Sequence, residues 1–418
     1  MKTFSFLIIC FLLLIGCKPK KSERYTHNPF AVNVTFDNSK TIKASEIFKR
    51  PVLIPLNTPD SLLLGNVSQI IISNKNIIVL ESYSPFGRLF IFDRSGSYLH
   101  DFGQRGRGPN EFHGAKGIAL NENNDEITYQ ELIGKPGLVS SRLDGELMKY
   151  RNHKTTRIAN GGYSLIQDFN TGFYVISLEY IGDLDKNKRT KVKLGIYDDE
   201  KNIMFPAIMD PLGFTLPIGI INYNQLFRFS DNVYFKPVTW DTIYRISGNK
   251  AIPEYYLDFG KHSLPNRMHY AKTELEYFSL RNSNPIAAFI HYFWAETNNF
   301  FIGAFKVGSI GDVLFIQGKS SGKSLAVNQF QNDYIGETNP AALSKGYLPQ
   351  KVISDTLLIL HEPSVLINGL QDIKHSLTSE DFREFKESNY QYVEMVEKLN
   401  ITDNPIIGLY PLKSNLLK

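Results

Sequence analysis

Cysteine is almost absent from this sequence. The 418 residues include only Cys10 and Cys17, and both lie close to the N-terminus. The rest of the chain therefore cannot form an internal disulfide. This excludes a small secreted scaffold held together by disulfides, and the fold must depend on a hydrophobic core, which a chain of this length can build.

A large excess of one charge is also absent. The chain has 46 basic and 42 acidic residues, a net charge of +4, and its lysines and arginines are dispersed. A nucleic-acid-binding surface needs clustered positive charge. We therefore expect no nucleic-acid partner.

The usual metal-ligand spacings are missing as well. The nine histidines include no H-x-x-x-H or H-E-x-x-H pattern. In "FIHYFWAETN", residues 289–298, strand alternation places His291 and Glu296 on opposite faces, which argues against a metal pair. "GKSSGKS", residues 318–324, lacks the full spacing of a phosphate-binding loop and is typical of a hairpin tip. The sequence predicts no cofactor, with Ca²⁺ in a central channel as the alternative.

The N-terminus has the pattern of a secretory leader. Lys2 precedes an apolar run from Phe4 to Leu14, which is too short to span a bilayer. "LIGC", ending at Cys17, resembles the bacterial lipobox, in which the cysteine is acylated and the leader is cleaved before it. We predict a signal peptide over residues 1–16 and lipidation of Cys17. The alternatives are an ordinary signal peptide and an uncleaved anchor.

A basic, polar stretch, "KPKKSERYTHNPF", follows the cysteine. We interpret residues 17–42 as a flexible tether, and the acyl chains would hold the protein on a membrane surface. Surface export of lipoproteins in some bacteria uses acidic residues next to the cysteine. The basic residues here favour the periplasmic side of the outer membrane.

Short alternating runs rich in aromatic residues fill the rest of the chain. They are divided by clusters of Asn, Asp, Gly and Ser, a pattern typical of all-β proteins. The clearest case is residues 67–103, which read as four strands in hairpin succession: "VSQIIIS", "NIIVLES", "RLFIFD" and "SYLHDFG". This unit predicts one antiparallel four-stranded sheet.

The four-stranded unit recurs at a spacing of about 50 residues, the period of a β-propeller. The third strands of successive units end near Asp93, Asp144, Asp198 and Ser247. We predict an all-β, six-bladed β-propeller of four-stranded antiparallel blades over residues 43–418, with small helical insertions. A pair of β-sandwiches is the alternative.

Three segments depart from the repeat. Helical spacing predicts an insertion at about 266–283 and a helix at about 379–398. "NPIIGLYPLK", residues 404–413, returns to a strand pattern. We expect "RPVLIPLN", residues 50–57, to pair with this closing strand, so that the two ends of the chain complete the last blade.

Several phrases resemble a known family, the six-bladed β-propeller lipoproteins of Bacteroidetes, and more distantly the NHL-repeat and TolB-like propellers. In that family the first blade commonly ends in a phrase matched here by Gly103, Gly106, Gly108, Pro109, Glu111 and Phe112. "DTIYRI", residues 241–246, and the closing "NPIIGLYPLK" are two further matches. Asn110 stands where the family tends to have glycine. The resemblance implies a fold and a compartment but no particular activity.

Residues 102–112, "FGQRGRGPNEF", could serve as a connection or as a binding loop. Glycine and proline let the chain cross from one blade to the next, and Phe102 and Phe112 would pack between the blades. As a binding loop, it would present Arg105 and Arg107 to an anionic group, with Glu111 in the same segment.

Trp240 and Asp241 form a second candidate site. An indole beside a carboxylate can hold a sugar ring, although a core tryptophan at the start of a strand is the simpler interpretation.

These observations favour a membrane-anchored, non-enzymatic binding or scaffold protein of the bacterial envelope. The ligand would be a glycan, a peptide or a partner protein. Two alternatives stay open. One is a lactonase-like, metal-dependent hydrolase or lyase with its site in the channel, which rests on analogy alone. The other is a signalling or assembly partner within an envelope complex.

Overall fold

The computed structural model describes most of the chain from residue 29 onward. The residues that it does not describe are 1–28, 38, 58, 60–61, 82–86, 104–105, 107–110, 113, 132–136, 145–146, 153–156, 159–164, 170–172, 178–180, 186–187, 191, 199–202, 210–224, 266–267, 269–270, 337–340, 344–348 and 350. The predicted signal peptide, the lipidation site Cys17, and the candidate residues Arg105 and Arg107 therefore lie outside the described residues.

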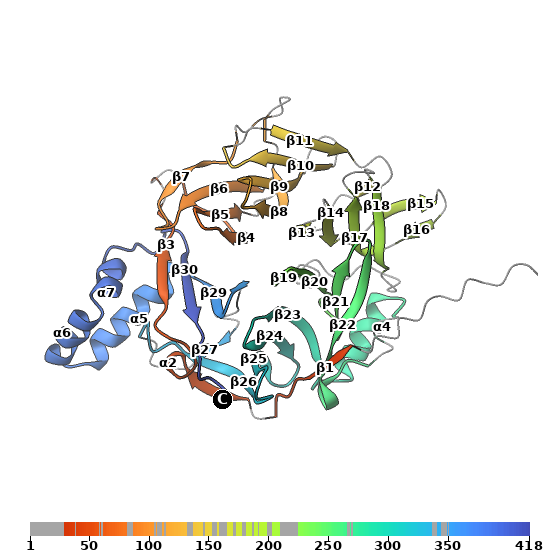
Figure 1. Ribbon diagram of the computed structural model, residues 1–418. Helices are drawn as coiled ribbons and strands as arrows, with labels where there is room; N and C mark the ends of the chain where they lie inside the picture. Colours follow the sequence, from red (N-terminus) through yellow and green to blue (C-terminus); the bar gives the residue numbers. More distant parts are fainter. Residues whose placement is uncertain are drawn as a thin grey trace, which may run out of the picture.

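Antiparallel sheets are arranged in a ring around a central axis, as a β-propeller (Figure 1). Five of the sheets are blades, each with a core of four strands arranged in chain order. Blade 1 contains β4 (Val67–Ile72), β5 (Asn76–Glu81), β6 (Arg88–Asp93) and β7 (Tyr98–Asp101). Blade 2 contains β8 (Ala115–Asn121), β9 (Glu126–Glu131), β10 (Gly137–Arg142) and β11 (Leu147–Asn152).

The other three blades repeat this order. Blade 3 contains β13 (Leu165–Phe169), β14 (Phe173–Ser177), β17 (Val192–Asp198) and β18 (Ile203–Met209). Blade 4 contains β19 (Gln225–Phe229), β20 (Asn232–Lys236), β21 (Thr242–Ser247) and β22 (Lys250–Asp258). Blade 5 contains β23 (Ala288–Glu296), β24 (Phe300–Val307), β25 (Gly311–Gly318) and β26 (Ser324–Gln331), with β27 (Ala341–Ala342) paired to β26. A small side sheet joins β12 (Arg157–Ile158), β15 (Ile181–Asp185) and β16 (Lys188–Thr190).

The expected count of six blades is corrected to five. The remaining sheet of the ring is a composite: β28 (Lys351–Ile353), β29 (Thr356–His361) and β30 (Ile406–Pro411) come from the C-terminal part, and β3 (Val52–Pro55) from the N-terminal part. Val52 pairs with Leu409 and Ile54 with Ile407, within the segments in which we expected the closing pair. The sixth repeat is interrupted because helices occupy the chain between β29 and β30.

The last part of the expected tether, residues 29–42, is folded onto the ring. We expected a flexible tether up to residue 42, but β1 (Phe30–Asn33) pairs in parallel with β22, and β2 (Lys40–Lys43) pairs in parallel with β26. Val32 and Ile42 are buried in these strands. The segment therefore covers the outer edges of blades 4 and 5, which would otherwise present unpaired backbone groups. The short helix α2 (Ala44–Ile47) then leads to β3.

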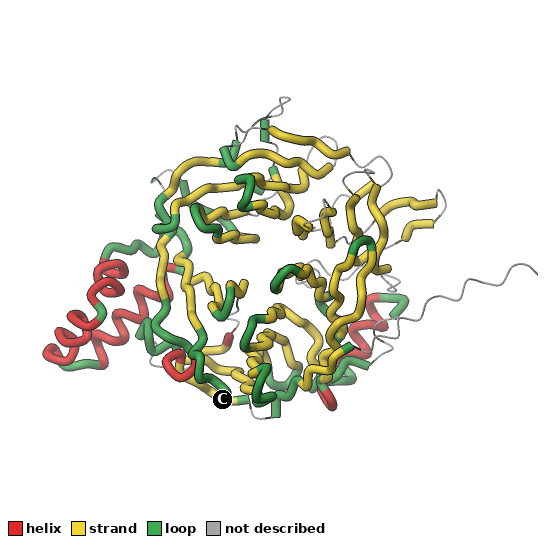
Figure 2. Tube along the Cα trace, in the orientation of Figure 1, coloured by secondary structure: helices red, strands yellow, loops and turns green. Residues whose placement is uncertain are grey.

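Helices lie outside the ring (Figure 2). The helix α4 (Glu274–Asn282) lies within the expected insertion, and the Thr273 side chain accepts a hydrogen bond from the backbone N–H of Glu276. A second insertion contains α5 (Pro363–Ser376), α6 (Ser379–Ser388) and α7 (Tyr390–Glu397), where we expected a single helix at about 379–398. Thr378 caps α6 in the same way as Thr273 caps α4. A one-turn 3₁₀ helix, η1 (Gly260–His262), follows β22.

The core consists of the apolar faces of neighbouring sheets. Phe36, Phe259 and Phe305, for example, meet where the N-terminal segment crosses from blade 4 to blade 5, with ring centroids 5.1–5.9 Å apart. Contacts of this kind between sheets fill the interior of a propeller.

The two ends of the sheets differ in the connections that leave them. The connections from the first to the second strand and from the third to the fourth strand are all short, and the longest of them is 319–323. The other connections leave the opposite end, and they include 259–287, which contains α4, and 362–405, which contains α5 to α7. We call these two ends the short-connection face and the long-connection face. Such asymmetry is typical of a scaffold that carries its functional surface on one face.

Prediction for ring closure: Ile54→Ala destabilises the protein by about 3 kcal/mol, because it removes buried apolar contacts between β3 and its neighbours. The side chain of Ile54 packs in a cluster with Ile407 and Leu358 of the composite sheet. The free energy of unfolding in urea measures this effect. The matched control on the same strand is Val52→Ala, where the side chain is 56 % exposed and the expected change is within about 0.5 kcal/mol. Equal effects of the two substitutions would contradict the closing role of β3.

Candidate functional site

The chain between blades 1 and 2 packs as a connection. The rings of Phe102 and Phe112 are 5.3 Å apart, and each lies within 5.6 Å of the ring of Tyr129 in blade 2. All three are buried in a cluster shared by the two blades. The Glu111 carboxylate lies so close to Gly106 that any larger side chain at residue 106 would overlap it. The described part of this segment is therefore folded on itself, and anion binding by Arg105 and Arg107 stays a prediction.

A buried polar cluster lies between blades 4 and 5. Lys236 ends β20, Asp241 immediately precedes β21, and His291 lies in β23, the first strand of the next blade. All three side chains are buried. The connection 237–241 leaves the long-connection face and follows the edge of blade 5, where the backbone N–H of His291 donates to the carbonyl of Val238 over 2.9 Å. The turn after β20 thus brings together residues that are distant in the sequence.

Lys236 organises this cluster. Its ammonium group donates to the carbonyl oxygens of Pro237 and Trp240, over 2.6 and 2.5 Å, and to Nδ1 of His291 over 2.6 Å. When Nδ1 accepts a hydrogen bond, the neutral imidazole carries its proton on Nε2. That nitrogen lies 3.9 Å from Oδ1 of Asp241. The ammonium, imidazole and carboxyl groups therefore lie in a row, and the 3.9 Å between imidazole and carboxyl is longer than a hydrogen bond.

The carboxyl group of Asp241 is poised to change charge near neutral pH. Burial raises its pKa to about 7, with Lys236 acting in the opposite direction and Asp258 adding to the rise. A charged carboxylate loses hydration energy in such a site, which explains the direction. The cluster can therefore take up and release a proton at Asp241 while Lys236 holds the connection in place. Perturbed carboxyl groups of this kind occur at functional sites and also in structural networks.

Trp240 lies on the other side of this connection. Its side chain is half-buried and packs on Tyr244, with ring centroids 6.2 Å apart. The carboxyl group of Asp241 faces His291, and its side chain is 10 % exposed. The structure therefore gives the two adjacent residues different environments, and sugar binding by the pair stays a prediction.

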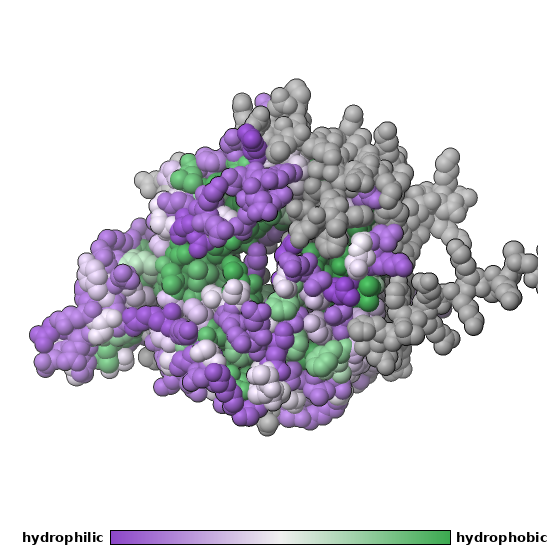
Figure 3. Space-filling view, in the orientation of Figure 1, coloured by the Kyte–Doolittle hydropathy of each residue, from purple (hydrophilic) through white to green (hydrophobic). Residues whose placement is uncertain are grey.

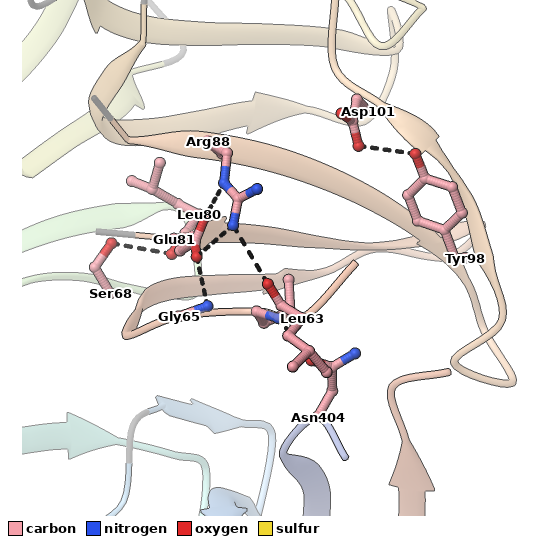
Figure 4. A network of polar contacts seen from close by, with 10 residues as sticks. Leu63, Gly65, Ser68, Leu80, Glu81, Arg88, Tyr98, Asp101 and Asn404 are labelled. Carbon is pink, nitrogen blue, oxygen red and sulfur yellow. Dashed lines mark hydrogen bonds and ion pairs between the residues drawn. The ribbon is translucent and has the colours of Figure 1, made fainter. Parts of the chain in front are cut away.

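A second charged network fastens the connection between the composite sheet and blade 1 (Figure 4). The buried carboxylate of Glu81, at the end of β5, binds the guanidinium group of Arg88 with both oxygens and accepts from the backbone N–H of Gly65. Arg88 also donates to the carbonyl of Leu63 over 3.3 Å. Asn404, before β30, accepts from the backbone N–H of Leu64 over 2.7 Å. Charge-assisted bonds thus hold the junction where the ring closes.

His361 occupies the same position in the composite sheet as Glu81 and Lys236 do in blades 1 and 4. Each is the last residue of the second strand, at the long-connection face, and each is buried. Burial lowers the pKa of His361 to about 4. Its Nε2 lies 2.7 Å from the hydroxyl of Tyr410, which accepts from the side-chain amide of Asn332 over 2.8 Å.

At the short-connection face, Lys319 and Glu296 join blades 4 and 5. Lys319 donates to Glu296 over 2.7 Å, and its ammonium group lies 4.6 Å from the ring centre of Phe229. Tyr255 donates to the other oxygen of Glu296 over 2.7 Å. Burial, together with Glu296, raises the pKa of Tyr255. Glu296 and His291 lie near opposite ends of the junction and do not form one site.

The segment "GKSSGKS" forms the tip of the hairpin between β25 and β26. Residues 318–322 match the literal pattern G-x-S-x-G, which marks a catalytic serine when it joins a strand to a helix. Here the pattern, with Ser320 as its serine, joins two strands of one sheet. The context is therefore that of a hairpin and does not match a nucleophile elbow.

In the described part of the chain, no three His, Cys, Asp or Glu side chains gather in a way that could hold a metal ion. Among the same residues, no helix is both long and apolar enough to cross a membrane.

The fold and the arrangement of its connections define a β-propeller. The chain belongs to the family described as Domain of unknown function (DUF4934), which matches residues 29–411. A comparison with curated proteins gave no match.

Two solved structures from Bacteroides have a similar fold. One is a candidate exported protein of Bacteroides fragilis, with a TM-score of 0.63 and 14 % identity over 92 % of this chain and 100 % of that chain. The other is a member of the duf4221 family from Bacteroides vulgatus, with a TM-score of 0.50 and 11 % identity over 88 % of this chain and 97 % of that chain. At these identities the similarity shows the fold alone.

Sequence reasoning found Trp240 and Asp241 but missed Lys236 as part of a site. The signal was present, because "VYFKPVTWD" places a lysine at the end of an otherwise apolar strand, where a charged side chain needs buried partners. The partnership with His291 gave no signal in the sequence, since the register between two blades decides it.

Prediction for the Lys236–His291–Asp241 cluster: Asp241→Asn makes the protein more stable than wild type at pH 8, by on the order of 2 kcal/mol. The raised pKa of Asp241 means that the folded state holds a proton at a pH where the unfolded state has released it. The contribution of this residue to stability is therefore largest near pH 4 and is lost as the pH rises to 7. The advantage of the variant should shrink steadily from pH 8 to pH 5.

Urea titration at each pH gives the difference in unfolding free energy between variant and wild type, and this difference tests the prediction. His361 acts with the opposite sign, because its lowered pKa costs stability as the pH falls from 6.5 to 4. His361 is present in both proteins, so its contribution cancels when the unfolding free energy of wild type is subtracted from that of the variant. A difference that is constant from pH 5 to pH 8 would contradict the assignment of the perturbed carboxyl group to Asp241.

Proposed function

We propose that this protein is a lipid-anchored binding or scaffold propeller of the bacterial envelope. The observation that carries the proposal is the asymmetry of the connections: the long insertions all leave the same end of the ring of sheets. Binding residues concentrate on long connections held by such scaffolds. The long-connection face would receive a partner protein, with a glycan or a peptide as the other possible ligands.

The leader and the comparisons support the envelope location. The apolar run and "LIGC" have the form of a lipoprotein signal, and a structure with the same fold belongs to a candidate exported protein of Bacteroides fragilis. We further propose that acylated Cys17 holds the chain on the outer membrane, on its periplasmic side. The alternative of a lactonase-like hydrolase has no observation in its support, so we propose no catalytic role.

Prediction for the anchor: Cys17→Ser moves the protein from the detergent phase to the aqueous phase when whole bacterial cells are extracted and partitioned. The reason is that acyl chains contribute about 0.8 kcal/mol for each buried methylene group, and the variant cannot carry them. Cys10→Ser is the matched control, because Cys10 lies inside the leader and should leave the partition unchanged. Retention of the Cys17→Ser protein in the detergent phase would contradict lipidation at this residue.

Prediction for the binding face: a photo-cross-linking amino acid at Leu377 or Ile401 captures a defined envelope component in living cells. Both residues are exposed, 36 % and 71 %, on the insertion that leaves the long-connection face. The control position is Asn298, an exposed residue at the opposite face. We expect the same discrete adduct from both test positions and none from the control. An adduct from Asn298 alone, or no adduct from any of the three positions, would contradict the proposed binding face.

A further inference from the structure

The place where the chain joins the folded body shows which side of the propeller meets a membrane. The first strand, β1, pairs in parallel with the outer strand of blade 4, with Phe30 beside Tyr255 and Asn33 beside Asp258. The segment that begins at Cys17 therefore reaches the body at Phe30. When fully extended, the stretch from Cys17 to Phe30 spans at most about 45 Å. An anchor on Cys17 thus keeps this part of the body within that distance of the lipid.

Phe30 lies next to the short connections of blade 5. Its ring stacks on Phe301, with centroids 6.4 Å apart, and meets the edge of Tyr255 at the same distance. Phe301 lies in the hairpin that turns through residues 297–299, and the ammonium group of Lys319, from the connection 319–323, lies 5.2 Å from the centre of the Phe301 ring. The chain therefore enters the body between blades 4 and 5, midway along β22 and beside the short connections of blade 5.

The side chains around this point suit a lipid–water boundary. Phe30 is 61 % exposed although it is a large apolar residue. Lys323 on the neighbouring connection is exposed and donates to the backbone carbonyl of Lys418 over 2.7 Å, whereas Lys319 is bonded to Glu296. An exposed aromatic ring near an exposed lysine suits a membrane surface, because the ring can enter the headgroup region while the ammonium group stays in water.

One face of the molecule carries a separate group of hydrophobic residues. Figure 3 shows these residues over blade 1 and the composite sheet, between hydrophilic residues. This area lies away from blades 4 and 5, where the chain enters the body.

We propose that the short-connection face at blade 5 lies against the lipid surface, and that the long-connection face points away from it into the periplasm. This inference rests on the proposed anchor at Cys17. It adds an orientation: the insertions with α4 and with α5 to α7 are free to meet a partner, whereas the region around Phe30 is shielded by the membrane.

Energy transfer to the membrane tests this orientation on the full lipoprotein. The protein is reconstituted in phosphatidylcholine vesicles that contain a rhodamine-labelled lipid as acceptor. A donor dye is attached through a clickable amino acid, by Lys323→azidolysine at the short-connection face or by Ile401→azidolysine at the other face. Ile401 is 71 % exposed, on the connection that returns to β30. The length of β24, eight residues, separates the two ends of a blade by about 25 Å.

We expect several-fold more transfer from the donor at position 323 than from the donor at position 401. Equal transfer, or more transfer from position 401, would overturn the orientation. To separate this result from the anchor itself, the same measurement uses unacylated protein whose Cys17 is coupled to a maleimide lipid. If natural protein does not bind vesicles but the coupled protein shows more transfer from position 323 than from position 401, the anchor proposal fails and the orientation stands. If the coupled protein shows equal transfer from the two positions, the orientation fails whatever the natural state of Cys17.

Discussion

The pairing of β3 with β30 is the interaction on which the rest of the structure depends. It joins a strand near the N-terminus to a strand near the C-terminus, and it completes the one sheet that the chain cannot form in sequence order. A propeller without it would expose an open sheet edge at each end of the ring. The parallel strands β1 and β2 have a similar role, because the N-terminal segment also covers the edges of blades 4 and 5.

Buried polar and charged side chains fasten the connections that the ring positions. Glu81, Lys236 and His361 end the second strands of three sheets, and each bonds to groups outside its own strand. A charge buried without partners would cost several kcal/mol, so the surrounding backbone must stay in one arrangement to satisfy it. This constraint makes the long-connection face a fixed base for the helical insertions, and a fixed base is what a binding surface requires.

Much of this architecture could be predicted from the sequence, because short alternating runs and turn residues repeat with a nearly constant period. The strands around Asp93, the helix cap at Thr378 and the pairing of residues 50–57 with residues 404–413 all follow from local patterns. The edge strands at Phe30 and Lys40 could not be predicted in this way, since two short strands of mixed residues in a polar segment give little signal. The contact between Asp241 and His291 depends on how two blades lie against each other, which no local pattern encodes.

Hydrogen exchange at β3 tests the central claim most directly. If the closing pair holds the ring together, the backbone amides of β3 that donate to β30, which are alternate residues of this edge strand, open only when the whole protein unfolds. Their free energy of exchange then equals that of the amides in β24, deep in blade 5. A free energy for β3 well below that of β24, with the blades still protected, would show that the ring stands without its closing strand and would contradict the account.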